Sequence, residues 1–255
     1  MNKLYWITGG TSGIGLAVAE TLAKKGASLI LSSRTAENKK EIVSHLEKFG
    51  AKNVELANMN MTSPLSKNEI QKILNQKKLN GVVINSGGPK SGDLNSLSAE
   101  DFKNANELLL VGPQQFIQNC VSFLVPYKSS IVAITSTSVK EPVRNLNLSA
   151  IYRTGFSVYL KLLSKELSAD GIRVNSVGPG PTKTKHLMNI IENESKIKNV
   201  PAHKIEKEWN QRSVLGRMGE PEEVAQAVSF LLSEEASFIN GQILLADGNS
   251  THCYF

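Results

Sequence analysis

Short apolar runs alternate with amphipathic stretches along the whole chain. Seven runs have the length and composition of strands: residues 4–8, 27–33, 53–58, 82–85, 131–136, 172–177 and 243–246. Helical spacing of apolar positions predicts helices at residues 14–25, 37–48, 66–77, 100–110, 113–125, 149–169 and 221–233. Parallel strands need a crossover connection, so this alternation predicts an α/β fold with a single doubly wound parallel sheet of Rossmann type, flanked by helices.

Residues 183–213 interrupt this alternation. The stretch is rich in lysine, asparagine and glutamate and contains no strand-like run. It follows a strand end, the side on which doubly wound sheets bind ligands, and connections of such length are commonly functional. We therefore expect a single domain over residues 1–255 with a lid at 183–213; a surface excursion without function is the alternative.

Composition narrows the function classes. Hydrophobic residues make up 40% of the chain and charged residues 20%, which excludes intrinsic disorder as its main state. No apolar run approaches the ~20 residues of a membrane helix, and the first residues lack a signal-peptide layout. The two cysteines, Cys120 and Cys253, are too few for a disulfide framework and lack metal-ligand spacing. We expect a cytoplasmic protein with no membrane contact and no metal.

A formal net charge of +6 is spread along the chain rather than gathered in one arm. This distribution favours a small acidic ligand and argues against nucleic acid as a partner.

A glycine-rich loop separates the first strand from the first helix at residues 8–15 (TGGTSGIG). Glycines permit positive φ angles and let the backbone approach a pyrophosphate, which the N–H groups at the start of the helix stabilise. The position of the loop in the alternation makes a dinucleotide site the stronger interpretation, and a tight turn without a ligand the weaker one. The candidate contacts in this loop are Gly9, Thr11, Ser12, Gly13, Ile14 and Gly15.

The second strand ends at Ser33 and Arg34. An acidic residue at this point would bind a free ribose hydroxyl and repel a 2′-phosphate, whereas an arginine can pair with that phosphate. The pair favours NADP over NAD as the cofactor.

Five segments together resemble the short-chain dehydrogenase/reductase family, in its compact form similar to the 3-oxoacyl-carrier-protein reductases. They are residues 8–15, 84–87 (INSG), 171–180 (GIRVNSVGPG), 216–224 (GRMGEPEEV) and 240–248 (NGQILLADG). The resemblance covers nearly the whole chain. It implies cofactor contacts at the adenine, along the ribose and beside the nicotinamide, respectively at Asn60 and Met61, at Asn85, Ser86 and Gly87, and at Pro179, Gly180, Thr182 and Thr184. It also implies a homo-oligomer, a dimer or tetramer, formed through the helix at 149–169 and the C-terminal segment.

The catalytic pattern of that family is altered here. The family uses a tyrosine as proton donor, a lysine four residues later, a carbonyl-polarising serine and an asparagine on an earlier helix. The serine matches Ser136, but the family's spacing, counted forward from Ser136 and backward from Gly171, places Ser149 at the tyrosine position. Arg153 stands at the lysine position, and Leu109 at the asparagine position.

These replacements have direct chemical consequences. A serine hydroxyl is a far weaker acid than a phenol, so Ser149 can orient a carbonyl but is a poor proton donor. Arg153 keeps the positive charge and can hold ribose hydroxyls, yet it cannot pass protons as a lysine can. Tyr152 lies on the same helix near Ser149 and is a candidate acid; a tyrosine that only forms the wall or core is the alternative.

Cations near the predicted strand ends suggest an anionic small-molecule substrate, although solvated lysines explain them equally well. They are Lys90, Lys140, Arg144, Lys183, Lys185 and His186.

Three functions remain open at this point. The first is an NADP-dependent oxidoreductase acting on a carbonyl or alcohol with an altered site, in which Ser136 and Ser149 polarise the substrate and water, Tyr152 or the substrate itself supplies the proton. The second is a catalytically silent dinucleotide-binding or regulatory protein, and the third is a lyase or isomerase on the same fold.

Overall fold

A seven-stranded parallel sheet forms the centre of the molecule in the computed structural model, which describes residues 3–253. The strand order is β3-β2-β1-β4-β5-β6-β7. The strands are β1 (Leu4–Thr8), β2 (Ser28–Ser33), β3 (Asn53–Asn58), β4 (Gly81–Ile84), β5 (Ser130–Ile134), β6 (Arg173–Pro179) and β7 (Ile243–Ala246). From β1 the sheet is extended on one side by β2 and β3, and on the other side by β4 to β7. This change of side between β3 and β4 is typical of a doubly wound sheet, so the predicted fold class is confirmed.

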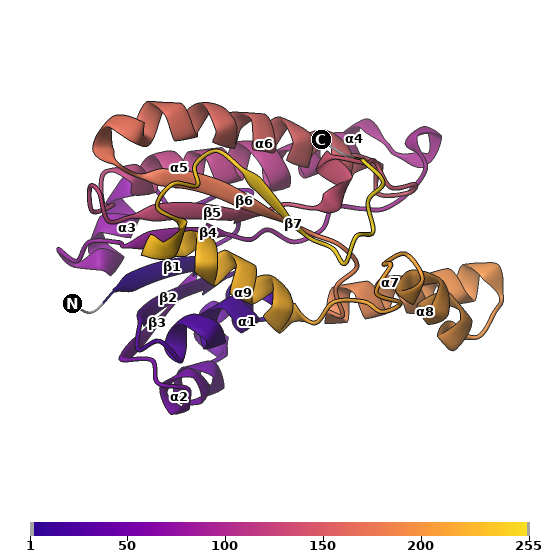
Figure 1. Ribbon diagram of the computed structural model, residues 1–255, viewed down its shortest axis with the longest axis horizontal. Coiled ribbons are helices and arrows are strands. Elements are labelled where there is room, and N and C mark those ends of the chain that lie inside the picture. Colours follow the sequence, from indigo (N-terminus) through magenta and orange to yellow (C-terminus); the bar gives the residue numbers. More distant parts are fainter. Residues whose placement is uncertain (1–2, 254–255) are drawn as a thin grey trace.

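Helices cover both faces of the sheet (Figure 1). One layer contains α1 (Gly13–Ala23), α2 (Glu41–Lys48) and α9 (Pro221–Leu232), and the other contains α3 (Lys67–Leu74), α4 (Ala99–Asn106), α5 (Gly112–Val121) and α6 (Asn147–Glu166). Strand residues alternate between the layers: Ile7 packs in the core under α1 and α9, while its neighbour Trp6 packs against Phe116 of α5 with ring centroids 5.5 Å apart.

The helix expected at 100–110 ends earlier than its sequence pattern suggests. α4 stops at Asn106, and residues Glu107–Val111 form a π-helical turn in which Gly112 N–H donates to Glu107 O. A Cβ on Gly112 would lie 1.8 Å from the carbonyl oxygen of Met61. The loop that contains Met61 therefore approaches the chain closely at Gly112, and this contact, rather than the local sequence, determines where α4 ends.

The expected insertion folds as two helices, α7 (Lys185–Lys198) and α8 (Ala202–Asn210), and contains no strand. Figure 1 shows both helices projecting beyond the end of the sheet. The pair has a small core of its own that includes Leu187, Ile191 and Trp209.

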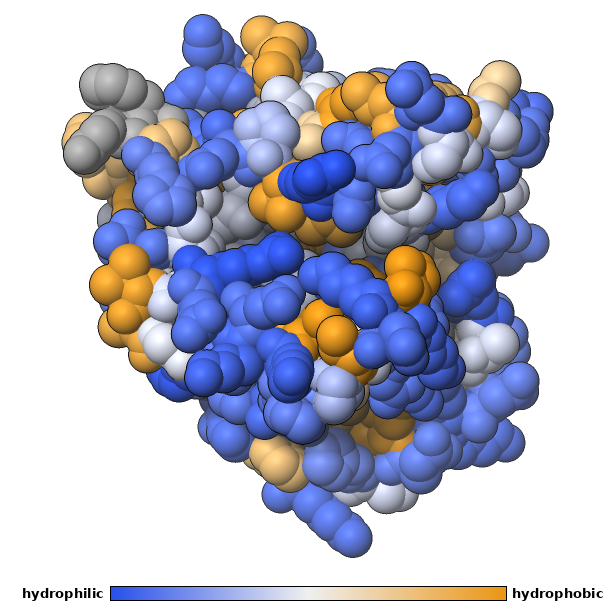
Figure 2. Space-filling view, turned by 90° about the vertical axis from the view of Figure 1, so that its right-hand side faces the viewer, coloured by the Kyte–Doolittle hydropathy of each residue, from blue (hydrophilic) through white to orange (hydrophobic). Residues whose placement is uncertain are grey.

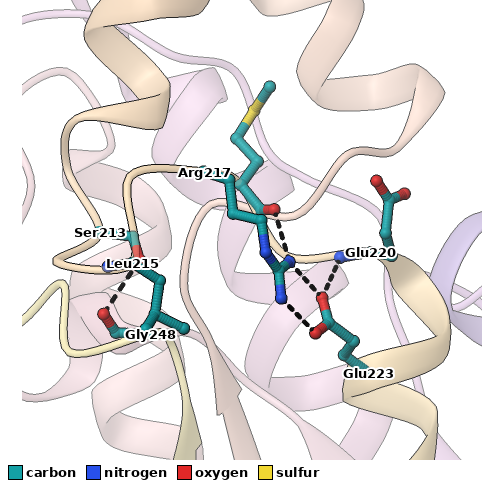
Figure 3. Close-up of polar contacts among 7 residues, drawn as sticks. Ser213, Leu215, Arg217, Glu220, Glu223 and Gly248 are labelled. Carbon is teal, nitrogen blue, oxygen red and sulfur yellow. Dashed lines mark hydrogen bonds and ion pairs between the residues drawn. The ribbon is translucent and has the colours of Figure 1, made fainter.

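Hydrogen bonds fix the chain where the insertion returns to the sheet (Figure 3). The Ser213 hydroxyl donates to Gly248 O at 2.9 Å. Arg217 forks onto Glu223, with both N–O distances at 2.7 Å, and Glu223 also caps the start of α9. The base of the insertion is therefore held while α7 and α8 extend from it.

Short turns complete the chain. Turns of 3₁₀ helix occupy Ala36–Asn38, Leu94–Ser96, Thr137–Val139, Leu167–Asp170 and Glu234–Ala236. Within residues 3–253, no helix is long and apolar enough to cross a membrane. Within the same residues, no group of histidine, cysteine, aspartate or glutamate side chains is placed to hold a metal ion.

Candidate active site

A cleft of about 1160 Å³ lies at the carboxyl ends of the strands. It runs from the end of β2 past β1, β4 and β5 to the end of β6, and α7 forms part of its wall. Figure 2 views the molecule from this end and shows a mostly hydrophilic face with a hollow across it. Parallel strands direct all their carboxyl ends to one edge, which is why residues from distant parts of the chain meet here.

The glycine-rich loop forms one wall of the cleft. Gly9 and Gly13 have φ angles of 57° and 53°, which favour glycine. A Cβ on Gly15 would lie 2.2 Å from Gly9 O, so Gly15 allows α1 to pack on the loop. Ser12 precedes α1 without a side-chain cap, and the first turn of the helix contains no acidic residue. The N–H groups at the start of α1 are thus available to an anion such as a pyrophosphate.

Hydrogen bonds hold the glycine-rich loop against the end of β4. The backbone N–H of Asn85 donates to Thr8 Oγ1 at 2.8 Å, and Asn85 Nδ2 donates to Gly9 O at 3.2 Å. Asn85, Ser86 and Gly87 line the middle of the cleft next to that loop.

A chain of polar contacts marks the end of β2. Lys39 Nζ donates to Thr11 Oγ1 at 3.0 Å, and the Thr11 hydroxyl donates to Ser33 Oγ at 3.0 Å. Arg34 is exposed beside them, and all four residues line the cleft. The acid of this connection, Glu37, accepts from Asn58 Nδ2 at 3.0 Å and is not part of the cleft lining. This corner is therefore positively charged.

Arg153 on α6 connects three parts of the site. Its Nε donates to Ser149 Oγ at 3.2 Å, its Nη1 to Ile134 O at 2.9 Å and its Nη2 to Gly87 O at 3.3 Å. A guanidinium has five N–H groups, so one on each Nη remains available to a ligand. The arginine thereby fixes the ends of β5 and β4 relative to α6.

Arg153 carries its positive charge at neutral pH. Burial lowers the pKa of Arg153 to about 10. It therefore supplies a fixed positive charge beside the serines.

The hydroxyl groups of Ser136 and Ser149 can both donate a hydrogen bond to a ligand. Ser149 Oγ accepts from Arg153, and Ser136 Oγ accepts from the backbone N–H of Ser138 at 3.1 Å. In these bonds the serine oxygens are acceptors, so each O–H can donate to an oxygen in the cleft. The arrangement can polarise a carbonyl at two points.

Residues of the insertion line the far side of the cleft. Thr184 begins α7 by accepting from Leu187 N at 3.3 Å, and its side chain lies near Gly13 of the glycine-rich loop. Trp209 and Arg212 also line the cleft, with the guanidinium carbon 3.6 Å from the centroid of the indole ring.

The structure brings most of the predicted site residues together. All the predicted cofactor contacts line the cleft except Gly15, which packs beneath the loop. Ser136, Ser149 and Arg153 also line it, whereas Tyr152 does not. Leu109, which the resemblance places at the relay position, is buried in the core.

The predicted cations divide into two groups. Lys90, Lys185 and His186 line the cleft. The other three, Lys140, Arg144 and Lys183, are outside its lining.

Sequence reasoning missed several cleft residues: Lys39, Glu141, Trp209, Arg212, Thr251 and His252. Lys39 could have been found as a second cation shortly after Arg34. The C-terminal residues reach the cleft because His252 N–H donates to Glu141 Oε2 at 2.6 Å, a contact without a local sequence signal.

Comparisons with known proteins agree on one family over the full length. Residues 9–251 match a family model described as enoyl-(acyl carrier protein) reductase. The uncharacterised oxidoreductase YmfI of Bacillus subtilis is 31% identical over 255 residues, covering 99% of this chain and 100% of that protein. The 3-oxoacyl-[acyl-carrier-protein] reductase FabG of Aquifex aeolicus is 30% identical over 256 residues, covering 96% of each chain.

A solved structure shows the same architecture. YwfH, described as an NADPH-dependent reductase involved in bacilysin biosynthesis, superimposes with a TM-score of 0.91 at 26% identity. The match covers 99% of this chain and 100% of YwfH.

Proposed function

Since the chain belongs to the short-chain dehydrogenase/reductase family of oxidoreductases, we propose that it is an NADPH-dependent reductase of a carbonyl substrate, working with Ser149 and Arg153 in place of the usual tyrosine and lysine. The observation that carries the proposal is the continuity of the cleft. It joins the glycine-rich loop at one end to Ser136, Ser149 and Arg153 at the other.

The residues present fit a phosphorylated dinucleotide. The uncapped start of α1 suits the pyrophosphate, and Arg34 with Lys39 suits a 2′-phosphate. Asn60 and Met61 suit the adenine end of the cleft. YwfH supports the choice of NADPH, because it is described as an NADPH-dependent reductase.

The chain's own residues position the reaction. When bound, the reduced nicotinamide supplies hydride, and this chemistry belongs to the cofactor. Ser136 and Ser149 donate hydrogen bonds to the substrate oxygen, and Arg153 stabilises negative charge that develops there. Its fixed fork also holds Ser149 in place for that contact.

We also propose that the substrate is an anion, such as a carboxylate or a carrier-linked acyl group. Lys185 on α7, together with Arg212, gives this end of the cleft a positive charge. Stacking on Trp209 fixes the plane of the Arg212 guanidinium, so its edge can bind a carboxylate or phosphate with little loss of side-chain entropy. In this proposal the insertion at 183–213 acts as the lid that brings these groups to the substrate.

We propose a homo-oligomer formed through α6. Three large apolar side chains on this helix are exposed: Ile151, Val158 and Leu162. Exposed apolar residues on one helix are typical of an interface between subunits.

We propose a cytoplasmic location. The two cysteines, Cys120 and Cys253, are both free, which supports a reducing compartment.

The test measures NADPH binding and turnover together. NADPH affinity is measured by nucleotide fluorescence, and NADPH oxidation at 340 nm is followed with acetoacetyl-coenzyme A, pyruvate and neutral ethyl acetoacetate. We expect binding, with turnover of an anionic probe faster than that of the ester. Binding without turnover of any probe would favour a silent dinucleotide-binding protein, and absence of binding would refute the proposal.

A further inference from the structure

His186 lies in the first turn of α7, directly over the loop that follows β4. A Cβ on Gly88 would lie 2.6 Å from His186 Nε2 and 3.1 Å from Cε1. The imidazole therefore packs on the backbone at Gly88, and the missing side chain there makes room for it. His186 also lines the cleft.

The same loop contacts the altered catalytic pair. Gly87, the residue before Gly88, accepts from Arg153 Nη2 at 3.3 Å, and Arg153 Nε donates to Ser149 Oγ at 3.2 Å. The imidazole and the guanidinium thus meet consecutive residues of one loop. This places His186 at the end of the cleft where the substrate oxygen would bind.

Few cleft residues can release a proton near neutral pH. Among the described residues that line the cleft, the histidines are His186 and His252, and histidine is the residue type whose ordinary pKa lies closest to neutral pH. Nδ1 of His252 lies 3.3 Å from Glu141 Oε1, and its backbone N–H is bound to the same carboxylate. Arg153 remains charged and the serine hydroxyls are much weaker acids. This leaves His186 as the candidate proton donor among the side chains that line the cleft.

The surroundings keep the His186 proton easy to release. Burial, and then the positive charge of Arg153, lower the pKa of His186 below its ordinary value of 6.5. The other charged or titratable side chains lining this end of the cleft are Lys90, Glu141, Lys185, Arg212 and His252. Lys90 is paired with Asp101 at 2.8 Å.

We propose that His186 is the proton donor of this site, an inference that rests on the proposed reductase function. During reduction the carbonyl carbon receives hydride and the electron pair of the C–O π bond moves to the oxygen. That oxygen takes one proton from the imidazolium, which becomes neutral and is reprotonated by a hydronium ion or buffer acid from the bulk solvent, so the reduction consumes one solvent proton. In the direction of oxidation, the neutral ring accepts the alcohol proton.

Kinetics of His186→Gln test this role, with His203→Gln as the matched control. His203 is an exposed histidine on α8 outside the cleft lining. We expect His186→Gln to lower kcat/KM for the best probe ~100-fold or more, with NADPH affinity within about 3-fold of the parent. The parent's kcat/KM should fall as the pH rises through a pKa below 6.5, because the protonated ring is needed, and the variant should lack this fall. A parent-like rate and pH profile in His186→Gln would overturn the proposal.

A second readout does not depend on turnover. The imidazole resonances of the full chain are followed by NMR between pH 4.5 and 8, and the His186 signal is assigned by its loss in His186→Gln. We expect a midpoint below 6.5 that rises in Arg153→Gln and changes when NADP⁺ is added. A ring that does not titrate in this range, or one that NADP⁺ leaves unaffected while the nucleotide is bound, would overturn the role of His186. Failure of the nucleotide to bind would instead refute the proposed function, so the two failures can be told apart.

Discussion

Replacement of Arg34 should change the cofactor preference of this protein. Arg34 is exposed at the end of β2, next to the contacts that join Lys39, Thr11 and Ser33. A 2′-phosphate placed there carries a charge of about −1.5 to −2 near neutral pH, if it ionises as other phosphate monoesters do. NADH lacks this group, so the comparison of NADPH with NADH isolates its contribution.

The size of the effect follows from the exposure of Arg34. Two unit charges about 4 Å apart interact by about 1 kcal/mol in water, and salt reduces this further. Loss of the arginine should therefore cost about 1–2 kcal/mol, and reversal of its charge about 3 kcal/mol. These values correspond to about 10-fold and about 100-fold in NADPH affinity for Arg34→Gln and Arg34→Asp. Lys39 is half-buried and hydrogen-bonded to Thr11, so it should retain part of the binding in both variants.

The assay is a fluorescence titration of both nucleotides at two salt concentrations. NADH affinity should change less than 3-fold in the Arg34 variants, and the NADPH effect should shrink at high salt. Lys40→Gln is the matched control, because Lys40 is an exposed neighbour outside the cleft lining. Equal affinity of the parent for the two nucleotides, or an Arg34→Asp variant that keeps the parental ratio, would refute the reasoning.

Three further changes test other parts of the structure. Ser149→Tyr combined with Arg153→Lys should raise the rate of ethyl acetoacetate reduction, because a phenol beside a lysine is a stronger acid than serine; a folded, NADPH-binding variant without a gain would refute the assignment of position 149. Gly112→Ala should lower the free energy of unfolding by about 3 kcal/mol in urea, because its Cβ would overlap a backbone oxygen 1.8 Å away. Its control is Gly155→Ala, where the nearest atom is 3.7 Å away and no loss is expected. Arg212→Gln should raise KM for pyruvate about 10-fold with little change for ethyl acetoacetate; equal effects on both probes would exclude an anion contact.

The strands and the cofactor loop could be predicted because local sequence determines them. A buried parallel strand is a short apolar run, so β1, β3 and β7 match their predicted bounds. The glycine-rich loop could be predicted equally well, because its glycines, the preceding strand and the following helix are adjacent in the chain. Helix starts were less predictable: residues 36–38 form a separate 3₁₀ turn before α2 begins at Glu41.

The rest of the site depends on contacts between distant segments. Lys39 becomes a cofactor candidate only through its bond to Thr11, and His252 reaches the cleft only through Glu141. The π-helical turn before Gly112 similarly arises where the Met61 carbonyl approaches. None of these contacts leaves a periodic pattern in the sequence, so spacing arguments could not find them.

If Arg153 stands at the family's lysine position, as we propose, the proton source lies elsewhere in the cleft. An arginine cannot pass a proton at neutral pH, but its planar fork can hold Ser149 and two carbonyl oxygens at once. Arg153 thereby fixes the positions of Ser149 and the two carbonyl oxygens and supplies a positive charge. The proton must then come from a group that titrates near neutral pH. His186 is such a group, and it belongs to α7 of the insertion rather than to the sheet. Proton delivery in this protein would therefore depend on the position of the insertion, whereas cofactor binding would rest mainly on the loops at the strand ends.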